Sequence, residues 1–527
     1  MTFNLKELSV QKMLAQRVMP RLDGALLGDR DYMKGVMGLV EAGVGGFILF
    51  GGDFWEVRQA LPRLQARAKI PLLIASDMEH GAGQQLRGAT SFPFQMAIAA
   101  ATDLVGGDGM GLLADMLQGM AEEARGAGVH AVLGPVLDVN SNPENPIICT
   151  RAFSDEPQVV SALGERYVLG LQGANPPVMA CAKHFPGHGE AGLDSHTSLP
   201  TIEKDRYSLE EEDMLPFRKA IMAGAEMVMT AHLKAPDLDP AYPASLSGKI
   251  TRGYLRNRSG FEGLIVTDAL DMGALRDRYT PREAARLAIK AGADILLHPP
   301  EPAAFLKDIM DMSARREVTK EETMAPAARL SRAKAKYCLP ARLSDNQMRA
   351  RIIKNGEVAQ ELARRALTLV KAGGAFPALR DVKGRIAHIV LEDDGDARAG
   401  RVLRSLLAKR HKHLSNLFVT RSKAGALKSE ALRASRESVL TIISIFSKVS
   451  AGKGSSGLSP ELMELGAQMA RRKRSVAVSF GSPYILRHFM EAEYVVAAYD
   501  PGEAMQEAAC RAFMGEMVFR GDLPVRI

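Results

Sequence analysis

Short apolar runs recur between residues 44 and 298, and most of them end in a polar or ionisable side chain. Helical patterns separate the runs, as expected for parallel βα units. The carboxyl ends of parallel strands meet at one edge, where a (β/α) barrel gathers its active site. The runs span 44–50, 71–76, 131–137, 178–182, 226–231, 264–267 and 293–297, and the residues that follow them include Asp77, Asp138, Lys183, His184, His232, Asp268 and His298.

This pattern predicts an α/β fold in two parts. We expect a (β/α)8 TIM-like barrel over residues 1–340, opened by a helix or helical lead-in over 6–27, and then a second three-layer α/β domain over residues 341–527. A doubly wound open sheet would also place ligands at strand ends. However, no Gly-x-Gly-x-x-Gly follows the first run, and polar ends on so many strands favour a closed barrel. The expected strands of the second domain are 368–370, 386–390, 439–443, 476–480 and 494–499.

Composition excludes several partners. The net charge of +7 is modest for 527 residues, and no Lys/Arg block is interleaved with aromatic residues, so we expect no nucleic-acid partner. No apolar run is long enough to span a bilayer, so we expect no membrane partner. Four scattered cysteines and the lack of a signal-peptide core in residues 1–21 predict a cytoplasmic protein with reduced thiols. No cofactor is predicted, and the oligomeric state is left open.

The densest chemistry lies in Lys183-His184-Phe185-Pro186-Gly187-His188-Gly189, followed by Asp194-Ser195-His196. A polar surface loop with a tight turn is one interpretation. A second is a metal site built from His184 and His188 with Asp194 or His196. The Pro-Gly pair between the first two histidines breaks any helix that would align them, so no metal is predicted.

The favoured interpretation pairs Asp194 with His196. Residues two apart in an extended segment point to the same side. Asp194 can then hold one ring nitrogen of His196 while the other nitrogen faces a substrate, as in the orienting part of a catalytic triad.

Asp268 is the candidate partner group. A strand-end aspartate is often a helix N-cap, but Asp268 is expected on the same barrel rim as His196. Glycoside hydrolysis needs one group that attacks or stabilises the anomeric carbon and another that protonates the leaving oxygen. An ionised aspartate suits the first role, and a histidine suits the second near neutral pH.

With these motifs the sequence resembles glycoside hydrolase family 3, and specifically its β-N-acetylglucosaminidase branch. The 183–189 and 194–196 motifs carry the resemblance most specifically. Further matching segments extend it over nearly the whole chain: 74–79, 135–140 with 145–146 and 151–153, 266–272, 480–484, 515–516 and 523–525.

The resemblance implies a retaining exo-glycosidase that removes terminal β-linked N-acetylglucosamine from a small carbohydrate, such as a cell-wall fragment. It implies that Asp268 forms a covalent glycosyl-enzyme and that His196, held by Asp194, is the acid/base. The residues implied to hold the sugar are Asp77, Arg151, Lys183 and His184.

The sequence also departs from the family pattern. The branch usually has Asp-x-Glu-Gly-Gly-Arg, with an arginine eight residues after the aspartate, whereas here Gln85 stands at that later position. Arg87 is a candidate substitute, and His80 is either a substrate contact or a rim residue. These departures leave the exact sugar open.

Other functions stay open as well. A neutral histidine does not repel an anion, so phosphate can replace water and make the enzyme a phosphorylase. A family 3 hydrolase of another β-sugar, such as a β-glucoside, is a further alternative. A catalytically silent sugar-binding protein and a metal-dependent hydrolase are weaker ones.

Overall fold

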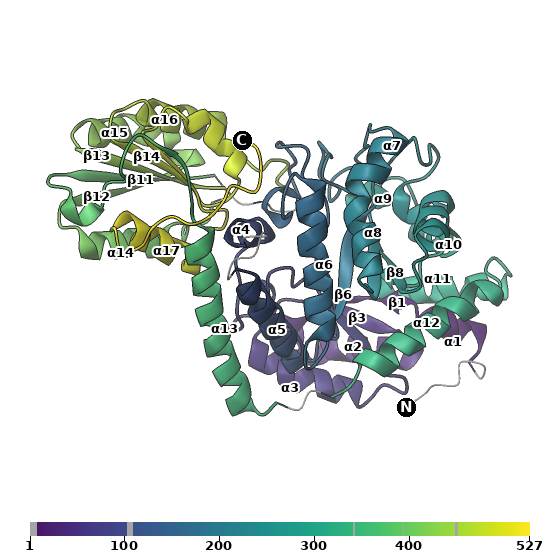
Figure 1. The fold of residues 1–527 in the computed structure, drawn as a ribbon. Helices are drawn as coiled ribbons and strands as arrows, with labels where there is room; N and C mark the ends of the chain where they lie inside the picture. Colours follow the sequence, from purple (N-terminus) through teal and green to yellow (C-terminus); the bar gives the residue numbers. More distant parts are fainter. Residues whose placement is uncertain (1–7, 103–108, 341–342, 394, 448, 450–451) are drawn as a thin grey trace. The chain divides into compact units, whose positions relative to one another are not determined.

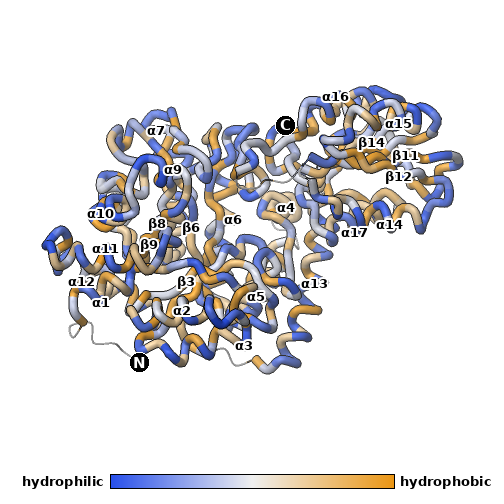
Figure 2. The backbone as a smooth tube through the Cα atoms, turned by 180° about the vertical axis from the view of Figure 1, so that it is seen from behind, coloured by the Kyte–Doolittle hydropathy of each residue, from blue (hydrophilic) through white to orange (hydrophobic). Residues whose placement is uncertain are grey.

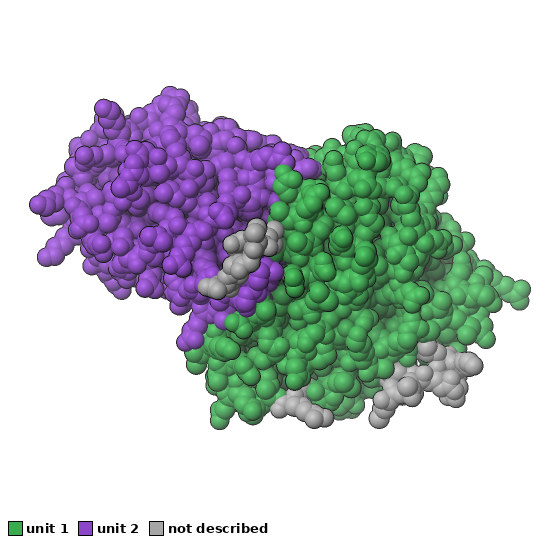
Figure 3. Space-filling model, viewed as in Figure 1, with its two compact units in different colours: residues 1–91, 114–139, 156–355 green, residues 92–113, 140–155, 356–527 purple. Residues whose placement is uncertain are grey.

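The computed structural model describes residues 8–102, 109–340, 343–393, 395–447, 449 and 452–527 (Figure 1). The chain forms two compact units, each with its own main sheet (Figure 3). The first contains residues 1–91, 114–139 and 156–355, and the second contains 92–113, 140–155 and 356–527. Both units are built from interleaved chain segments, and the domain boundary between residues 340 and 341 remains a prediction.

The first unit is built on a seven-stranded parallel sheet whose spatial order follows the sequence, β2 to β8. Short apolar segments form these strands, and nearly all of their residues are buried. Their bounds are β2 Arg21–Asp23, β3 Gly46–Phe50, β4 Leu73–Ser76, β5 Ala131–Val132, β6 Met179–Phe185, β7 Met227–Thr230 and β8 Leu264–Thr267.

A further strand pair closes this sheet into a barrel. β1 (Val18–Met19) precedes β2 with only Pro20 between them, and it pairs in parallel with β9 (Leu296–Leu297). The Val266–Ile295 bridge joins β8 to the β9 segment, and the Gly45 N–H donates to the Val18 carbonyl at 3.0 Å. If β1 and β2 count as one strand, the described residues form eight barrel strands, and the TIM-like prediction is confirmed.

The expected helical lead-in over 6–27 is wrong for most of its length. Helix α1 covers only Val10–Ala15, and its Ser9 N-cap accepts from the Lys12 N–H. Residues 18–23 are strand because they pair with β9 on one side and β3 on the other. Pro20 lacks an N–H, so it sits at the break between β1 and β2.

Alternate residues of the strands fill the barrel interior, as the two-residue period of a strand requires. Three residues of α12 (Glu321–Tyr337) complete this cluster, which also contains Cys181 as a small core residue. The members are Met19, Ile48, Leu73, Ala75, Ala131, Leu133, Met179, Cys181, Met227, Met229, Leu264, Val266, Ile295, Leu297, Leu330, Ala333 and Tyr337.

Helices follow most barrel strands and surround the sheet (Figure 1). In Figure 2 helices such as α12 and α13 alternate between hydrophobic and hydrophilic colours, as expected when one face packs and the other meets solvent. Their bounds are α2 Arg30–Ala42, α3 Phe54–Gln65, α5 Gly109–Ala127, α6 Pro157–Gly173, α8 Leu215–Met222, α9 Gly273–Arg276, α10 Pro281–Ala291, α11 Pro302–Ala314 and α13 Asp345–Ala366.

The second unit holds a six-stranded mixed sheet of order β10-β15-β14-β13-β11-β12, in which only the β10–β15 pair is antiparallel. Helices α14 and α17 cover one face, and α15 and α16 cover the other, which confirms the three-layer prediction (Figure 1). The strands are β10 Thr368–Ala372, β11 Ile386–Glu392, β12 Leu414–Thr420, β13 Leu440–Phe446, β14 Ser475–Ser479 and β15 Tyr494–Ala497. The helices are α4 Gln95–Ala101, α14 Arg401–Arg410, α15 Ala424–Arg436, α16 Pro460–Ala470 and α17 Glu503–Phe513.

Strand β12 was not among the expected strands of the second domain. It lies at the edge of the sheet, and most of its residues are exposed or half-buried. Within the described part of the chain, no helix has the length and apolar character needed to cross a membrane.

Candidate active site

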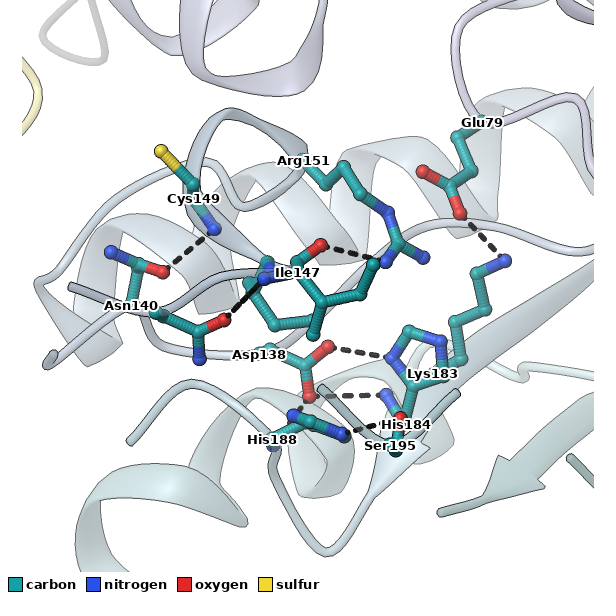
Figure 4. Close-up of polar contacts among 12 residues, drawn as sticks. Glu79, Asp138, Asn140, Ile147, Cys149, Arg151, Lys183, His184, His188 and Ser195 are labelled. Atoms are coloured by element: carbon teal, nitrogen blue, oxygen red, sulfur yellow. Dashed lines mark hydrogen bonds and ion pairs between the residues drawn. The ribbon is translucent and has the colours of Figure 1, made fainter. Parts of the chain in front are cut away.

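Lys183 lies near the end of β6 between two carboxylates. Its Nζ is 2.7 Å from Glu79 Oε1 (Figure 4). The same Nζ is 2.7 Å from Asp77 Oδ1, and both carboxylates follow β4. The lysine side chain is only 3% exposed and that of Glu79 6%, whereas that of Asp77 is 25% exposed. Lys183 therefore holds both carboxylates of the Asp77 loop, and Asp77 is the more accessible of the two.

Asp138 orients two histidines of the 183–189 segment. Its Oδ2 is 2.7 Å from His184 Nδ1, and its Oδ1 accepts the backbone N–H groups of His184 and His188 at 3.2 and 2.7 Å (Figure 4). Burial acts to raise the pKa of Asp138, but the two imidazoles and these hydrogen bonds outweigh burial and lower it. Asp138 is therefore an ionised acceptor, and it fixes the Nδ1 side of His184.

Asp194 and His196 form a dyad on the loop that follows. Asp194 Oδ1 lies 2.8 Å from His196 Nδ1 and also accepts the His196 backbone N–H at 2.9 Å. The Asp194 side chain is 1% exposed, while the imidazole of His196 is 40% exposed. The carboxylate is therefore buried behind the ring, and the ring presents its Nε2 edge outward.

His188 holds the same loop through a buried hydrogen bond. The Nε2 of His188 is 3.0 Å from the hydroxyl of Ser195, the residue between the two dyad members. Burial lowers the pKa of His188 to about 4, so this ring is neutral near pH 7. His188 is thus a buried connection between Asp138 and the dyad loop.

Asp268 follows β8 directly, and its side chain accepts the Ala269 N–H at 2.8 Å. Burial acts to raise the pKa of its carboxyl group, but the imidazoles of His184, His232 and His196 and this N–H lower it to about 2. The carboxylate is therefore ionised throughout the neutral range.

Backbone hydrogen bonds join the dyad loop to the segment after Asp268. The Gly273 N–H donates to the His196 carbonyl at 3.1 Å, and the Ala274 N–H to the Ser195 carbonyl at 3.4 Å. A Cβ on Gly273 would lie 2.7 Å from the His196 carbonyl oxygen. Only glycine therefore permits this approach, and it ties the loop that carries His196 to the one that begins with Asp268.

Two further histidines occupy strand ends on this rim. His232 follows β7, with Nδ1 at 2.7 Å from the Ser245 hydroxyl and Nε2 at 3.0 Å from the Ala269 carbonyl. His298 follows β9, and its Nε2 lies 3.3 Å from Asp271. Burial lowers the pKa of both imidazoles.

Gln85, at the position of the family arginine, is tied to the backbone. It donates to the Asp77 carbonyl at 3.2 Å and accepts the Gly51 N–H at 3.2 Å. Arg87 pairs at 3.5 Å with Asp53, and its side chain is 81% exposed. His80 contacts the Ser91 hydroxyl at 3.2 Å.

Arg151 belongs to the second unit, at the end of a 3₁₀ turn, Cys149–Arg151. Its Nη1 donates to the Ile147 carbonyl at 2.9 Å (Figure 4). In the same segment Asn140 accepts the Cys149 N–H at 2.9 Å and donates to the Tyr484 hydroxyl at 2.9 Å. The loop around Arg151 is therefore held by side-chain contacts within its own unit.

The geometry does not favour the metal interpretation. His184 directs Nδ1 to Asp138, His188 directs Nε2 to Ser195, and Asp194 is engaged with His196. Among the residues that the structure describes, no group of three or more His, Cys, Asp and Glu side chains is arranged to hold a metal ion.

Sequence reasoning missed the roles of Glu79 and Asp138. Both lie in segments that match the family, 74–79 and 135–140, but the sequence does not identify Glu79 as a partner of Lys183 or Asp138 as a partner of His184. Asp138 ends an apolar run, and Glu79 follows Asp77, another strand-end aspartate, by two residues. Their position at strand carboxyl ends was the available signal.

A parallel barrel whose rim carries an ionised carboxylate and a carboxylate-held imidazole has the groups that glycoside cleavage requires. Comparison with known proteins agrees, because the glycosyl hydrolase family 3 N-terminal domain matches residues 14–333. The chain belongs to glycosyl hydrolase family 3.

Among curated relatives, beta-hexosaminidase A of Pseudoalteromonas piscicida is 32% identical over 384 residues, which cover 66% of this chain and 63% of the relative. The match thus spans less than two thirds of that relative's length. Beta-hexosaminidase of Alkalilimnicola ehrlichii is 36% identical over 277 residues, covering 51% of this chain and 78% of the relative.

Solved structures match over almost the whole chain. A glycoside hydrolase family 3 beta-N-acetylglucosaminidase from Paenibacillus sp. str. FPU-7 has a TM-score of 0.85 at 26% identity, covering 98% of this chain and 99% of that one. Beta-glucoside phosphorylase BglX bound to 2FGlc has a TM-score of 0.84 at 25% identity, covering 99% and 95%.

Proposed function

We propose that this chain is a retaining exo-β-N-acetylhexosaminidase that releases terminal β-linked N-acetylglucosamine. The observation that carries the proposal is the Asp194–His196 dyad, which backbone hydrogen bonds link to the segment after Asp268. The beta-hexosaminidase names of the relatives and the N-acetylglucosaminidase structure support the choice of sugar.

In the first step the Asp268 carboxylate attacks the anomeric carbon. The bond from that carbon to the leaving oxygen breaks, and His196 donates its proton to that oxygen. The low pKa of Asp268, about 2, supports its role as the ionised nucleophile. Asp194 accepts from Nδ1 and so holds the ring in the orientation that presents Nε2.

In the second step water attacks the glycosyl-aspartate, and His196 removes the water's proton. Two displacements at one carbon retain the configuration. The released Asp268 carboxylate returns to its ionised state, so the cycle needs no cofactor.

The sugar itself is assigned to three residues of the barrel. We propose that Asp77, Lys183 and His184 bind its hydroxyl and acetamido groups from the barrel. The sugar contact of Arg151 stays a prediction of the sequence. The 25% exposure of the Asp77 side chain and the engagement of His184 Nδ1 with Asp138 support this, because they leave Asp77 and His184 Nε2 for the substrate. Lys183 sets the position of Asp77.

The substrate source is a further part of the proposal. We propose that the enzyme acts on cell-wall fragments recovered in the cytoplasm. The four cysteines are free thiols, which supports a reducing compartment.

Phosphorolysis is the second candidate function, and the similarity to beta-glucoside phosphorylase BglX supports it. A neutral imidazole would not repel phosphate as a carboxylate base would. Phosphate would then attack the glycosyl-aspartate and yield a sugar 1-phosphate. Gln85 stands where the β-N-acetylglucosaminidase branch has an arginine, and it is tied to the backbone. The sugar contact of that arginine is therefore missing, and a β-glucoside is a second sugar to test.

One screen separates these candidates. Aryl β-N-acetylglucosaminide and aryl β-glucoside are incubated with the enzyme, with and without phosphate, and phenol and sugar products are quantified. The proposal predicts at least tenfold higher kcat/KM for the N-acetylglucosaminide and free sugar in both buffers. Sugar 1-phosphate as the main product would establish the phosphorylase instead. No turnover of either glycoside would contradict both functions and favour a silent sugar-binding protein.

A further inference from the structure

A cavity of 540 Å³ lies in the first unit at the amino ends of the barrel strands. His130, immediately before β5, and Ile74 of β4 mark that end. Asp268 follows the carboxyl end of a parallel strand, so the cavity and the candidate active site lie at opposite ends of the barrel. The other walls come from the C-terminal parts of α3 and α5 and from residues 338–340.

Arg125 lines this cavity with an uncompensated charge. The residue is 3% exposed, its Nη2 donates to the Leu339 carbonyl, and its Nε and Nη1 have no hydrogen-bond partner among the described residues. Burial lowers the pKa of Arg125, and no carboxylate opposes that effect. A buried guanidinium that leaves two of its nitrogens without an acceptor is costly, and an anion would supply the missing acceptors.

Arg58, which also lines the cavity, differs in this respect. Its Nε donates to Asp345 at 2.9 Å, its Nη1 to the Gly126 carbonyl at 2.7 Å, and its Nη2 to the Leu343 carbonyl. Among the described residues that line the cavity, Asp345 is the only acid; its side chain is 65% exposed, and it is already paired with Arg58. The unmatched positive charge in the cavity is therefore that of Arg125.

His130 offers a second donor. Its Nδ1 accepts the Ile74 N–H at 3.0 Å, so the proton of the neutral ring lies on Nε2. Burial, together with Arg125 and Lys334, lowers the pKa of His130 to about 3 and keeps the ring neutral. The remaining walls are largely apolar and include Leu61, Pro62, Ile74, Leu339 and Pro340.

We propose that this cavity is a second binding site, which takes a small organic anion. The carboxylate or phosphate group of the ligand accepts N–H bonds from Arg125, and its apolar part packs against the leucine and proline walls. A ligand pocket of this size with one unmatched cationic group among largely apolar walls orients the ligand by its charged end. The site is independent of the proposed glycosidase function.

Binding is tested on the full-length protein with benzoate, phenyl phosphate, inorganic phosphate and the neutral benzyl alcohol. Calorimetry gives the affinities. Protection of Cys338 from prolonged iodoacetamide treatment at pH 9.5, followed by mass spectrometry, places the ligand, because Cys338 lines the cavity while Cys149, Cys181 and Cys510 are buried. The alkaline pH is needed because burial raises the pKa of the Cys338 thiol to about 11. Aryl glycoside turnover is measured separately, so a failure of either proposal is recognised by itself.

We expect at least one anion to bind tenfold or more tightly than benzyl alcohol and to protect Cys338 at the same concentrations. A preference for benzoate or for phenyl phosphate identifies the head group. Arg125→Gln should weaken binding at least tenfold, while the matched Arg58→Gln should change it less than threefold.

The proposal is overturned if no anion protects Cys338, or if folded Arg125→Gln binds as tightly as the wild type. If Arg125→Gln does not fold, Cys338 protection in the wild-type protein decides the matter.

Discussion

The backbone N–H of Gly273 donates to the carbonyl of His196 at 3.1 Å, which ties the proposed acid/base to the loop that follows the proposed nucleophile. Gly273 lies five residues after Asp268, and His196 lies on a separate rim loop. The contact exists because Gly273 has no side chain, since a Cβ there would lie 2.7 Å from the His196 oxygen.

Gly273→Ala should therefore impair catalysis. The new methyl group must push the 196–197 backbone away, and a misplacement of about 1 Å can cost about 100-fold in rate. We expect kcat to fall by about 10- to 100-fold while circular dichroism is unchanged. Gly192→Ala is the matched control, because no atom lies within 4 Å of its Cβ position. Equal activity of the two variants would show that the contact does not position His196.

Asp268→Asn should abolish turnover, with kcat lower by about 10⁴-fold or more, because the amide cannot attack the anomeric carbon. Asp271→Asn, which alters a nearby carboxylate paired with His298, should retain far more activity. Steady-state kinetics on an aryl glycoside measures both. Comparable losses in the two variants would argue against Asp268 as the nucleophile.

The pH dependence of activity should not report Asp268. Its pKa is lowered from 3.8 to about 2, so the carboxylate stays ionised as pH falls from 8 to 4. Any acidic limb of kcat/KM above pH 4 should therefore arise from another group. A limb that persists with its midpoint unchanged in His196→Ala, His184→Ala and Asp77→Asn would point back to Asp268 and contradict its low pKa.

His196→Ala should affect poor leaving groups most. General acid catalysis contributes about 10²- to 10⁴-fold, and a leaving group with a low pKa needs little of it. The first step should slow strongly for an alkyl or sugar aglycone and weakly for 2,4-dinitrophenolate. A series of aryl glycosides measures this dependence, and equal losses across the series would contradict the acid role.

Lys334→Met should stabilise the protein near neutral pH. Burial lowers the Lys334 pKa from 10.5 to about 7, so the folded state loses stability as pH falls from 10.5 towards 7. This pKa difference corresponds to a gain in the free energy of unfolding of roughly 5 kcal/mol at most. About 1–3 kcal/mol of that gain is lost because the Gln16 carboxamide is left without its donor.

Thermal melts at pH 7 and pH 9.5 test this prediction. The gain in Tm from Lys334→Met should be larger at pH 7 and should shrink at pH 9.5. Lys336→Met on the same helix is the control, since that side chain is 55% exposed. A gain that is independent of pH would show that Lys334 is charged in the folded state.

The barrel and the dyad could be predicted because their signals are local. Apolar runs ending in polar residues identify strands, and Asp194 reaches His196 two positions away within one loop. The Lys183–Asp77 pair spans 106 residues, and its second carboxylate, Glu79, depends on how β4 and β6 lie in the sheet. No local pattern specifies such a contact.

Tertiary pairing also decided the elements that were missed. Residues 18–23 carry a helical pattern, yet they become strand between β3 and β9 because the barrel must close. β12 is an edge strand in which Ser415 and Asn416 are exposed, so it lacks the continuous apolar run of the buried strands. In both cases the neighbouring strand, and not local propensity, determines the structure.

The central claim is that Asp268 becomes covalently glycosylated while His196 assists both steps. The most direct test mixes His196→Ala with an activated aryl β-N-acetylglucosaminide and maps peptides by mass spectrometry, because the variant can form the intermediate but hydrolyses it slowly. We predict a burst of phenol and one N-acetylhexosaminyl group on Asp268. A sugar on a different residue, or turnover with no covalent adduct and an inverted product, would contradict the mechanism.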